Sequence, residues 1–213
     1  MQDTGLMAFW SDIDPDYLLR YQQWHNCEHI PERVTSPGFL RGCRDRAMDN
    51  TPHFLMFYET EAPAALASDY YLNALNNSTP WTRDALQHFR NPARNIYRKM
   101  ETAGAAGPFA APWITSLRCN SPEPPTGWAA AMAARPGMLR VRLYQVDEEI
   151  SQIMISERKI YGGGPGAQQY LLLIEQSQPG AAATQDLLED RQSLDVFLNH
   201  YWLEMSHAKR TGQ

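Results

Sequence analysis

Hydrophobic residues recur along the first half of the chain at two spacings, and each spacing predicts a different element. Apolar runs bounded by turn residues predict strands, and apolar residues repeating every three or four positions predict helices. The second helical pattern is broken near Thr79-Pro80, where a proline can begin a new helical stretch. The order is strand, helix, strand, strand, helix, strand. The expected ranges are 6–13, 15–35, 39–48, 53–61, 63–89 and 94–101.

The second half of the chain shows the same order of elements. Its first helix is short and rich in Ala, and an extra segment, 148–166, separates its second and third strands. Because this segment ends in a run of glycines, 162–166, it cannot continue as a helix or strand there. We expect a turn or mobile loop that serves as a lid or a plain connector. The expected strands are 113–119, 138–146, 169–175 and 200–205, and the expected helices are 127–134 and 181–197.

Four short anchors occur in both halves in the same order, which indicates an internal duplication. The two stronger anchors are a Pro-Gly turn followed by a strand, and five apolar residues followed by Glu and, at a fixed distance, Pro. The matched ranges are 37–41 with 136–140 and 54–59 with 170–175; the weaker pairs are 9–10 with 112–113 and 95–97 with 199–201.

The repeated βαββαβ unit is the split βαβ, or ferredoxin-like, arrangement, in which helices cover one face of a four-stranded sheet. The other face is apolar and must be covered, and two such units in one chain can bury both open faces. We therefore predict an α+β protein made of two tandem ferredoxin-like units packed sheet to sheet as a pseudo-dimeric barrel. The units are residues 1–104 and 105–213, and the second contains the insertion at about 148–166.

The chain resembles the dimeric α+β-barrel superfamily, as a tandem pair. The element order carries this resemblance over nearly the whole chain. The run 24–33, Trp-His-Asn-Cys-Glu-His-Ile-Pro-Glu-Arg, followed by Pro37-Gly38-Phe39, is similar to the Trp/His and Pro-Gly pattern of EthD-like proteins. The resemblance implies small hydrophobic substrates, often aromatic or polyketide-derived, handled by lyases, isomerases, cyclases or monooxygenases that need no cofactor.

Charge and composition narrow the classes of partner. With 19 Lys and Arg against 24 Asp and Glu, the net charge is −5, which gives no general attraction to nucleic acid or anionic membranes. RNA-recognition domains share the element order, but their aromatic and basic motif is absent from 39–48 and 53–61. The three cysteines lack C-x-x-C spacing, and no signal peptide or spanning stretch is visible. We expect a cytoplasmic protein with no membrane partner, and a homodimer is left open.

The first predicted helix carries the strongest candidate chemistry. Its aromatic face, on a helical wheel, also holds a carboxylate and an imidazole, Glu28 and His25. Such groups should not face a sheet unless they are paired or line a cavity. A pocket between this helix and the sheet is therefore predicted. The residues expected there are Tyr21, Trp24, His25, Glu28, His29 and Arg33.

In this interpretation His25 or His29 is the general base or acid, and Glu28 orients or charges the imidazole. Arg33 would hold an anionic or enolate oxygen. The alternative is a structural network that holds the end of the helix. Residues 25–29 also match the H-x-x-E-H zinc signature, but the ferredoxin-like order is not a zinc-peptidase fold. A metal site built from His25, His29 and either Glu28 or His53 is a lesser alternative, and no metal is predicted.

Further candidates lie outside this helix. His53 opens a predicted central strand, and Tyr70 and Trp81 lie on the second helix; these three are expected to contact substrate together with Tyr21 and Trp24. His88 would suit an axial haem ligand, as in haem-binding members of the superfamily. The short helix 127–134 has no such chemistry, so one site is expected, in the first half.

These observations predict a cofactor-independent acid–base enzyme of the lyase, isomerase or cyclase type, acting on a small hydrophobic, aromatic substrate. Two alternatives stay open. One is a protein that binds a small molecule without catalysis, and the other is a barrel that binds haem or a metal.

Overall fold

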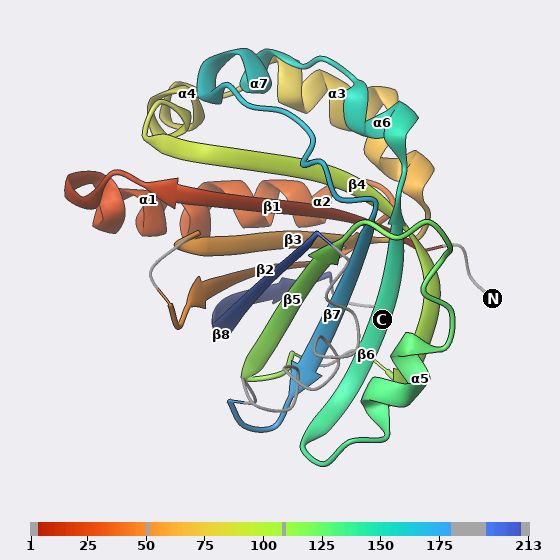
Figure 1. Cartoon of the computed structure of the whole chain (residues 1–213). Helices are drawn as coiled ribbons and strands as arrows, with labels where there is room; N and C mark the ends of the chain where they lie inside the picture. Colours follow the sequence, from red (N-terminus) through yellow and green to blue (C-terminus); the bar gives the residue numbers. More distant parts are fainter. Residues whose placement is uncertain (1–3, 50–51, 108–109, 180–194, 210–213) are drawn as a thin grey trace.

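The computed structural model describes residues 4–49, 52–107, 110–179 and 195–209. Over these residues, antiparallel strands close into a barrel in the order β1-β3-β2-β8-β5-β7-β6-β4 (Figure 1). The strands are β1 (Gly5–Ile13), β2 (Phe39–Ala47), β3 (Phe54–Thr60), β4 (Phe89–Gly104), β5 (Trp113–Cys119), β6 (Met138–Val146), β7 (Tyr170–Gln176) and β8 (Val196–Ala208).

The strand order shows the duplication directly. The first half forms the sheet β4-β1-β3-β2 and the second half forms β8-β5-β7-β6, which is the same order of first, second, third and fourth strands. The two sheets then join at both edges, through β2 with β8 and β4 with β6. This confirms the predicted α+β fold of tandem ferredoxin-like units. The division at residues 104 and 105 stays a prediction.

Helices gather on the outer face of the first sheet, whereas α5 covers the second (Figure 1). The extra segment of the second half forms α6 and α7, which cross over to the first half, where α7 packs against α3 and α4. The segment therefore extends the helical layer of the first unit. The helices are α1 (Leu18–Trp24), α2 (Ile30–Thr35), α3 (Asp69–Asn76), α4 (Pro80–Leu86), α5 (Trp128–Ala133), α6 (Glu148–Gln152) and α7 (Ser156–Tyr161).

The first predicted helix, 15–35, is continuous but irregular. It starts as a 3-10 turn (Pro15–Tyr17), continues as α1, widens into a π-helical turn (His25–His29) and ends as α2. In the wide turn the backbone N–H of Ile30 bonds to the carbonyl of His25, five residues earlier. Pro31 explains the change, because its ring has no N–H and would clash with the carbonyl of Cys27 in a regular α-helix.

Three other expectations differ from the structure. The predicted helix 63–89 is a 3-10 helix (Pro63–Ala67) followed by α3 and α4, with Ser68 and Thr79 as N-caps. Strand β4 begins at Phe89 rather than at residue 94, because the added residues pair with the end of β1. The predicted helix 181–197 lies mostly outside the described residues, but its last two residues belong to β8 instead, where they pair with β5.

Alternate residues of each strand face opposite sides of the barrel wall. In β1, Leu6 and Trp10 join the hydrophobic cluster inside the barrel, whereas Met7 and Phe9 join the cluster between the sheet and the helices. This second cluster contains most of the aromatic residues of the first half, and the cavity described below lies within it.

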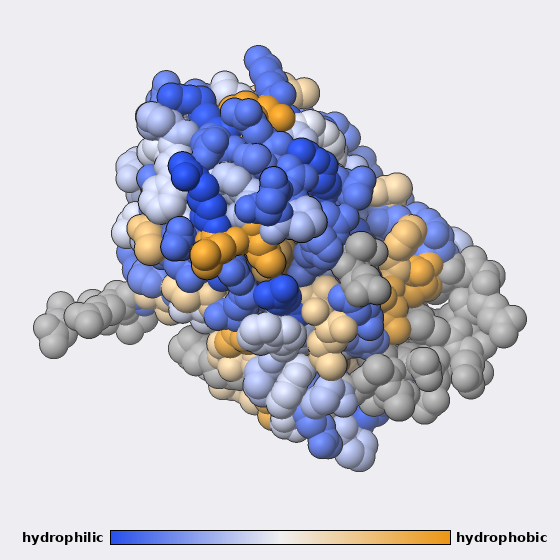
Figure 2. All heavy atoms as spheres, turned by 90° about the vertical axis from the view of Figure 1, so that its left-hand side faces the viewer, coloured by the Kyte–Doolittle hydropathy of each residue, from blue (hydrophilic) through white to orange (hydrophobic). Residues whose placement is uncertain are grey.

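The face of the molecule turned to the viewer in Figure 2 is mostly hydrophilic, with hydrophobic side chains only in small groups. Among the described residues, no helix combines the length and apolar character required to cross a membrane.

Candidate active site

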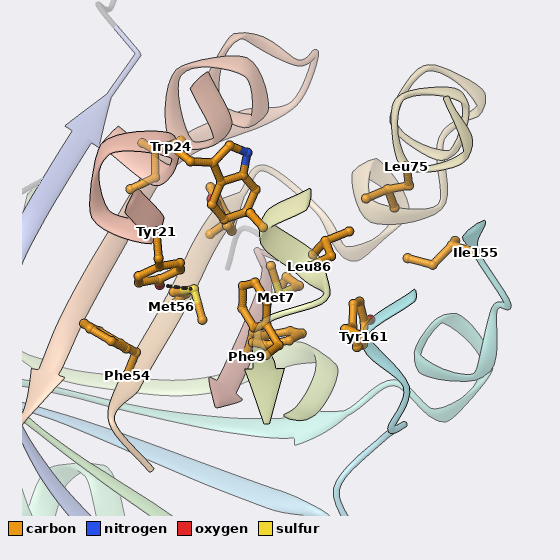
Figure 3. Close-up of a cluster of buried hydrophobic side chains, with 14 of the residues drawn as sticks. Met7, Phe9, Tyr21, Trp24, Phe54, Met56, Leu75, Leu86, Ile155 and Tyr161 are labelled. Carbon is orange, nitrogen blue, oxygen red and sulfur yellow. Dashed lines mark hydrogen bonds between the residues drawn. The ribbon is translucent and has the colours of Figure 1, made fainter. Parts of the chain in front are cut away.

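A cavity lies between the outer face of the first sheet and the helices that cover it. Its volume is about 40 Å³, comparable with that of a water molecule or two. Figure 3 shows side chains from three directions turned toward this region: Trp24 from α1, Met7 and Phe9 from β1, and Ile155 and Tyr161 from the segment that contains α7. The polar residues of the wall are His25, His29, Arg33, Tyr58, Tyr71, Arg94, Glu157 and Tyr161.

His25 is fully buried and is held by a chain of charged groups. Its Nδ1 lies 3.1 Å from a terminal nitrogen of Arg44, whose Nε donates to Glu204 at 2.6 Å. Because a guanidinium can only donate, Nδ1 must accept, and the proton of the neutral ring is on Nε2. Burial, and then the charge of Arg44, lower the pKa of His25 well below 6.5. His25 therefore offers an N–H donor at neutral pH, and Glu204 comes from the second half of the chain.

His29 lies one π-helical turn beyond His25, with ring centroids 5.5 Å apart. Its ring packs on Trp24 at 4.4 Å between centroids. Burial lowers the pKa of His29 well below 6.5, and the charges of Arg33 and His25 lower it further. The ring is thus neutral at pH 7, and an imidazole in this form can accept a proton on one nitrogen.

Several buried polar atoms of the cavity wall have no hydrogen-bond partner in the part of the chain that the structure describes. Buried polar groups almost always have partners, so such a group of atoms requires water or a ligand. The apolar remainder of the wall gives an incoming molecule hydrophobic contacts. The unsatisfied atoms are His25 Nε2, His29 Nδ1, Arg33 Nη1, Tyr58 Oη and Tyr161 Oη.

A buried ion pair closes one side of the cavity. Arg33 Nη2 donates to Glu157 Oε1 at 2.7 Å, and both side chains are about 95% buried or more. The hydroxyl of Ser78 also donates to Glu157, at 3.1 Å. Burial raises the pKa of Glu157, although the charge of Arg33 opposes this shift. Since Glu157 lies on α7, this pair fastens the extra segment to the end of the first helix.

Glu28 does not pair with an imidazole. Its carboxylate accepts from the hydroxyls of Thr79 at 2.5 Å and Thr82 at 3.0 Å, and Thr82 also accepts from the indole N–H of Trp24 at 3.1 Å. The expectation that Glu28 orients or charges a histidine is therefore wrong. Glu28 instead holds the N-terminus of α4 against the first helix and fixes the orientation of Trp24.

Other expected site residues lie away from the cavity. His53 is 41% exposed, and its Nδ1 accepts from the backbone of Ile13, near a different surface hollow. Tyr70 is 58% exposed, and its neighbour Tyr71 lines the cavity instead. Trp81 packs beside the cluster without reaching the cavity wall.

Tyr21 and His88 also stand apart from the wall of the cavity. Tyr21 is buried behind it, where its hydroxyl contacts the Met56 sulfur at 3.0 Å (Figure 3). His88 stacks on Tyr17 at 3.7 Å and bonds to Asp14, so it does not face the cavity as a haem ligand would.

The sequence did not point to Arg44, Tyr58, Glu157 or Tyr161. Strand alternation around Met56 could have placed Tyr58 on the helix-facing side. Glu157 and Tyr161 lie in the extra segment, which has no counterpart in the first half. Comparison of the two halves therefore could not predict where these side chains lie.

The residues present do not fit the metal or haem alternatives. Glu28 and His53, the proposed third ligands, are engaged elsewhere, and no group of three or more metal-binding side chains occurs within the described ranges. His88, the candidate haem ligand, stacks on Tyr17 and bonds to Asp14 outside the cavity.

No family model matches the chain, and no match to a curated protein was found. Solved structures do match over almost the full length. An anthrone oxidase-like protein shares 10% identity with a TM-score of 0.65, covering 98% of this chain and 94% of the other. A candidate monooxygenase from Fusobacterium nucleatum shares 8% with a TM-score of 0.61, covering 97% and 95%. A candidate chlorite dismutase shares 11% with a TM-score of 0.52, covering 96% of each. Likeness at these identities establishes a common ferredoxin-like barrel fold and no chemistry.

Proposed function

We propose that this protein is a cofactor-independent enzyme that removes a proton from a small aromatic substrate held between the first helix and the barrel. The observation that carries the proposal is the pair of neutral imidazoles in the cavity wall, each with one ring nitrogen that has no partner among the described residues. One nitrogen is a donor and the other can accept, which is the arrangement that acid–base catalysis requires.

The tautomer of His25 determines which of the two histidines would donate a hydrogen bond to the substrate and which would accept its proton. Its Nδ1 is occupied by Arg44, so Nε2–H would donate to the substrate oxygen that gains negative charge. His29 Nδ1 would take the proton: the substrate C–H bond breaks, its electron pair stays on the substrate, and His29 becomes a cation. A lowered pKa makes His29 a weak base in the empty site. The new negative charge beside the ring compensates by stabilising the protonated imidazole.

Arg33 would complete the binding of the anionic product. Its Nη2 is fixed by Glu157, whereas Nη1 has no hydrogen-bond acceptor among the described residues. A donor fixed in this way requires little reorganisation as charge develops on the substrate. Trp24, Phe9 and Tyr161 would supply the apolar walls.

A ring-sized substrate requires the cavity to widen from its present volume of about 40 Å³. The wall formed by Ile155, Glu157 and Tyr161 belongs to a surface segment, whereas the opposite walls are barrel strands and the first helix. We propose that the segment from α6 to α7 acts as the lid of the site.

Several classes of reaction begin with removal of a proton from the substrate. A lyase, isomerase or cyclase would pass through the carbanion or enolate without an oxidant, which fits the EthD-like resemblance of residues 24–33. The names of the structural neighbours favour a second outcome, in which the carbanion reacts with O2. For anthrone this would convert the CH2 group and one O2 into the quinone carbonyl and one water.

Proton exchange in D2O tests the proposal without knowledge of the final product. Anthrone and a set of phenols and ketones with acidic C–H groups would be incubated with the protein under argon, and loss of the C–H signal followed by NMR. We expect exchange faster than in buffer for at least one probe, and admission of O2 then separates the oxidative outcome from the others. A probe that binds tightly but never exchanges faster would overturn the proposal in favour of a binding protein.

A further inference from the structure

A second hollow lies at the end of the barrel where β1 begins and β3 ends. Its volume is about 300 Å³, at the lower end of the range for small-molecule sites. It shares no wall residue with the cavity at His25 and His29. The wall comes from the start of β1, the start of β2, the end of β3, the second half of β4, alternate residues of β6 and residues 105–107, which follow β4.

Cations dominate this end of the barrel. Glu59 accepts from Arg41 at 2.6 Å and from Arg142, and Glu175 accepts from Arg140 through two bonds, at 2.5 and 2.9 Å. In the described part of the chain, Glu59 and Glu175 thus pair with Arg41, Arg140 and Arg142, whereas the net charge of the whole chain is −5.

Arg142 has two guanidinium nitrogens without a hydrogen-bond acceptor among the described residues. Its Nη1 donates to Glu59, whereas Nε and Nη2 have no hydrogen-bond acceptor. Nη2 lies 3.4 Å from Glu175 without hydrogen-bond alignment. Nε–H and Nη2–H lie along the same edge of the group, which binds a carboxylate or phosphate through two parallel bonds. The residue is 5% exposed, so leaving these donors unsatisfied is costly.

Lys99 adds a positive charge from β4. Within the described residues it has no carboxylate within 4.0 Å, unlike the three arginines. Burial lowers the pKa of Lys99, and the charges of Arg142 and Arg140 lower it further, although Glu59 opposes them. The ammonium therefore lies in a positive potential that an anion would relieve.

The rest of the wall leaves space for a ligand. Residues 104–107 are Gly-Ala-Ala-Gly, and a side chain added at Gly107 would meet nothing within 4 Å. Glu59 is the one carboxylate among the described wall residues. Arg142 and Arg41 hold its pKa at about 2, so its charge is already compensated by cations.

We propose that this hollow binds the carboxylate or phosphate group of a small molecule, with Arg142 and Lys99 as its main ligands. The organic part of the molecule would lie toward Thr102, Leu40 and Tyr144. The site is independent of the proposed catalytic cavity, and its ligand need not be the substrate.

Calorimetric titration with inorganic phosphate, and separately with succinate, at constant ionic strength tests the proposal. We expect one bound anion per chain, with shifts of the amide signals of Gly5, Thr60, Gly104 and Gly107 in NMR spectra. Lys99→Gln should weaken binding at least fivefold. Because Lys99 makes no ion pair among the described residues, its replacement should leave the fold intact. Replacement of Arg142 would remove one of the two arginines that pair with the Glu59 carboxylate.

Lys159→Gln is the matched control, because Lys159 is exposed on α7 and its replacement changes the net charge equally. It should leave both affinities unchanged. Binding of one anion and not the other would identify the group that the site accepts and would support the proposal. Absence of stoichiometric binding by both anions, or equal weakening by the two lysine variants, would overturn it.

Discussion

Replacing His29 with glutamine is expected to lower the rate of proton exchange on an accepted probe at least about 100-fold, the lower end of the contribution of a positioned acid or base. Glutamine keeps a polar side chain of similar length but cannot take up a proton at neutral pH. The ring of His29 packs on Trp24, so some loss of stability is expected as well. Probe affinity should change much less than the rate, because the substitution removes the proton acceptor and leaves the apolar walls.

Two variants control this result. His25→Gln should also slow exchange, because it removes the N–H that would face the developing charge. His88→Gln should not, since His88 stacks on Tyr17 outside the cavity. If His29→Gln exchanges protons as fast as the unaltered protein, His29 is not the base. A loss in His88→Gln equal to that in His29→Gln would point to a general loss of folding.

Replacing Arg33 with methionine is expected to lower the free energy of unfolding by about 3–5 kcal/mol at pH 7. The substitution removes the ion-pair partner of the buried Glu157 carboxylate. The hydroxyl of Ser78 stays at hydrogen-bond distance, and Arg94 acts on Glu157 only through its more distant charge. The pKa of Glu157 is already raised by burial, and loss of Arg33 should raise it further. An acid whose pKa is raised in the folded state costs stability as pH rises above its unfolded value of 4.5, so the defect should be smallest in acid.

Urea denaturation of three variants measures this effect. The double variant Arg33→Met/Glu157→Gln should recover a large part of the lost free energy of unfolding, because it has no buried carboxylate without an ion-pair partner. Arg20→Met is the matched control: Arg20 pairs with Asp84 at 3.3 Å on the surface, where the loss of an ion pair changes stability little. Equal destabilisation by Arg33→Met and Arg20→Met would show that the buried pair does not hold the α7 segment in place.

Local pattern and the repeat were enough to predict the barrel. β5 and β6 have the bounds that their apolar runs predicted, 113–119 and 138–146. The duplication then required two sheets of the same topology, because each unit alone leaves an apolar face open. The pattern could not show that the sheets join edge to edge, since hydrogen bonds between strands far apart in sequence leave no periodic signal.

The wall of the cavity was predicted in part. The helical wheel placed Trp24, His25, His29 and Arg33 near one cavity, and the structure lines the cavity with all four. The wheel assumed a regular helix, however, and Pro31 widens the turn at residues 25–29. Glu28 therefore meets Thr79 and Thr82 rather than an imidazole.

The residues that the sequence missed depend on long-range contacts. Arg44 reaches His25 from β2, and Glu204 reaches Arg44 from the other half of the barrel. Tyr71 lines the cavity, whereas Tyr70 was predicted to do so. Ser68 caps α3, and the position of this cap fixes which of the two tyrosines turns inward. A one-residue shift of the helix start would have exchanged them.

A pH titration of 15N-labelled histidines by NMR would show whether the two imidazoles of the cavity are neutral. We expect His25 and His29 to stay neutral as pH falls through 6.5, with the proton of His25 on Nε2 and Nδ1 as the acceptor. Because unfolded histidines take up protons that these two refuse, the free energy of unfolding should fall as pH drops below 6.5. Protonation of either ring at or above pH 6.5 in the folded protein would show that the cavity does not hold a neutral donor–acceptor pair.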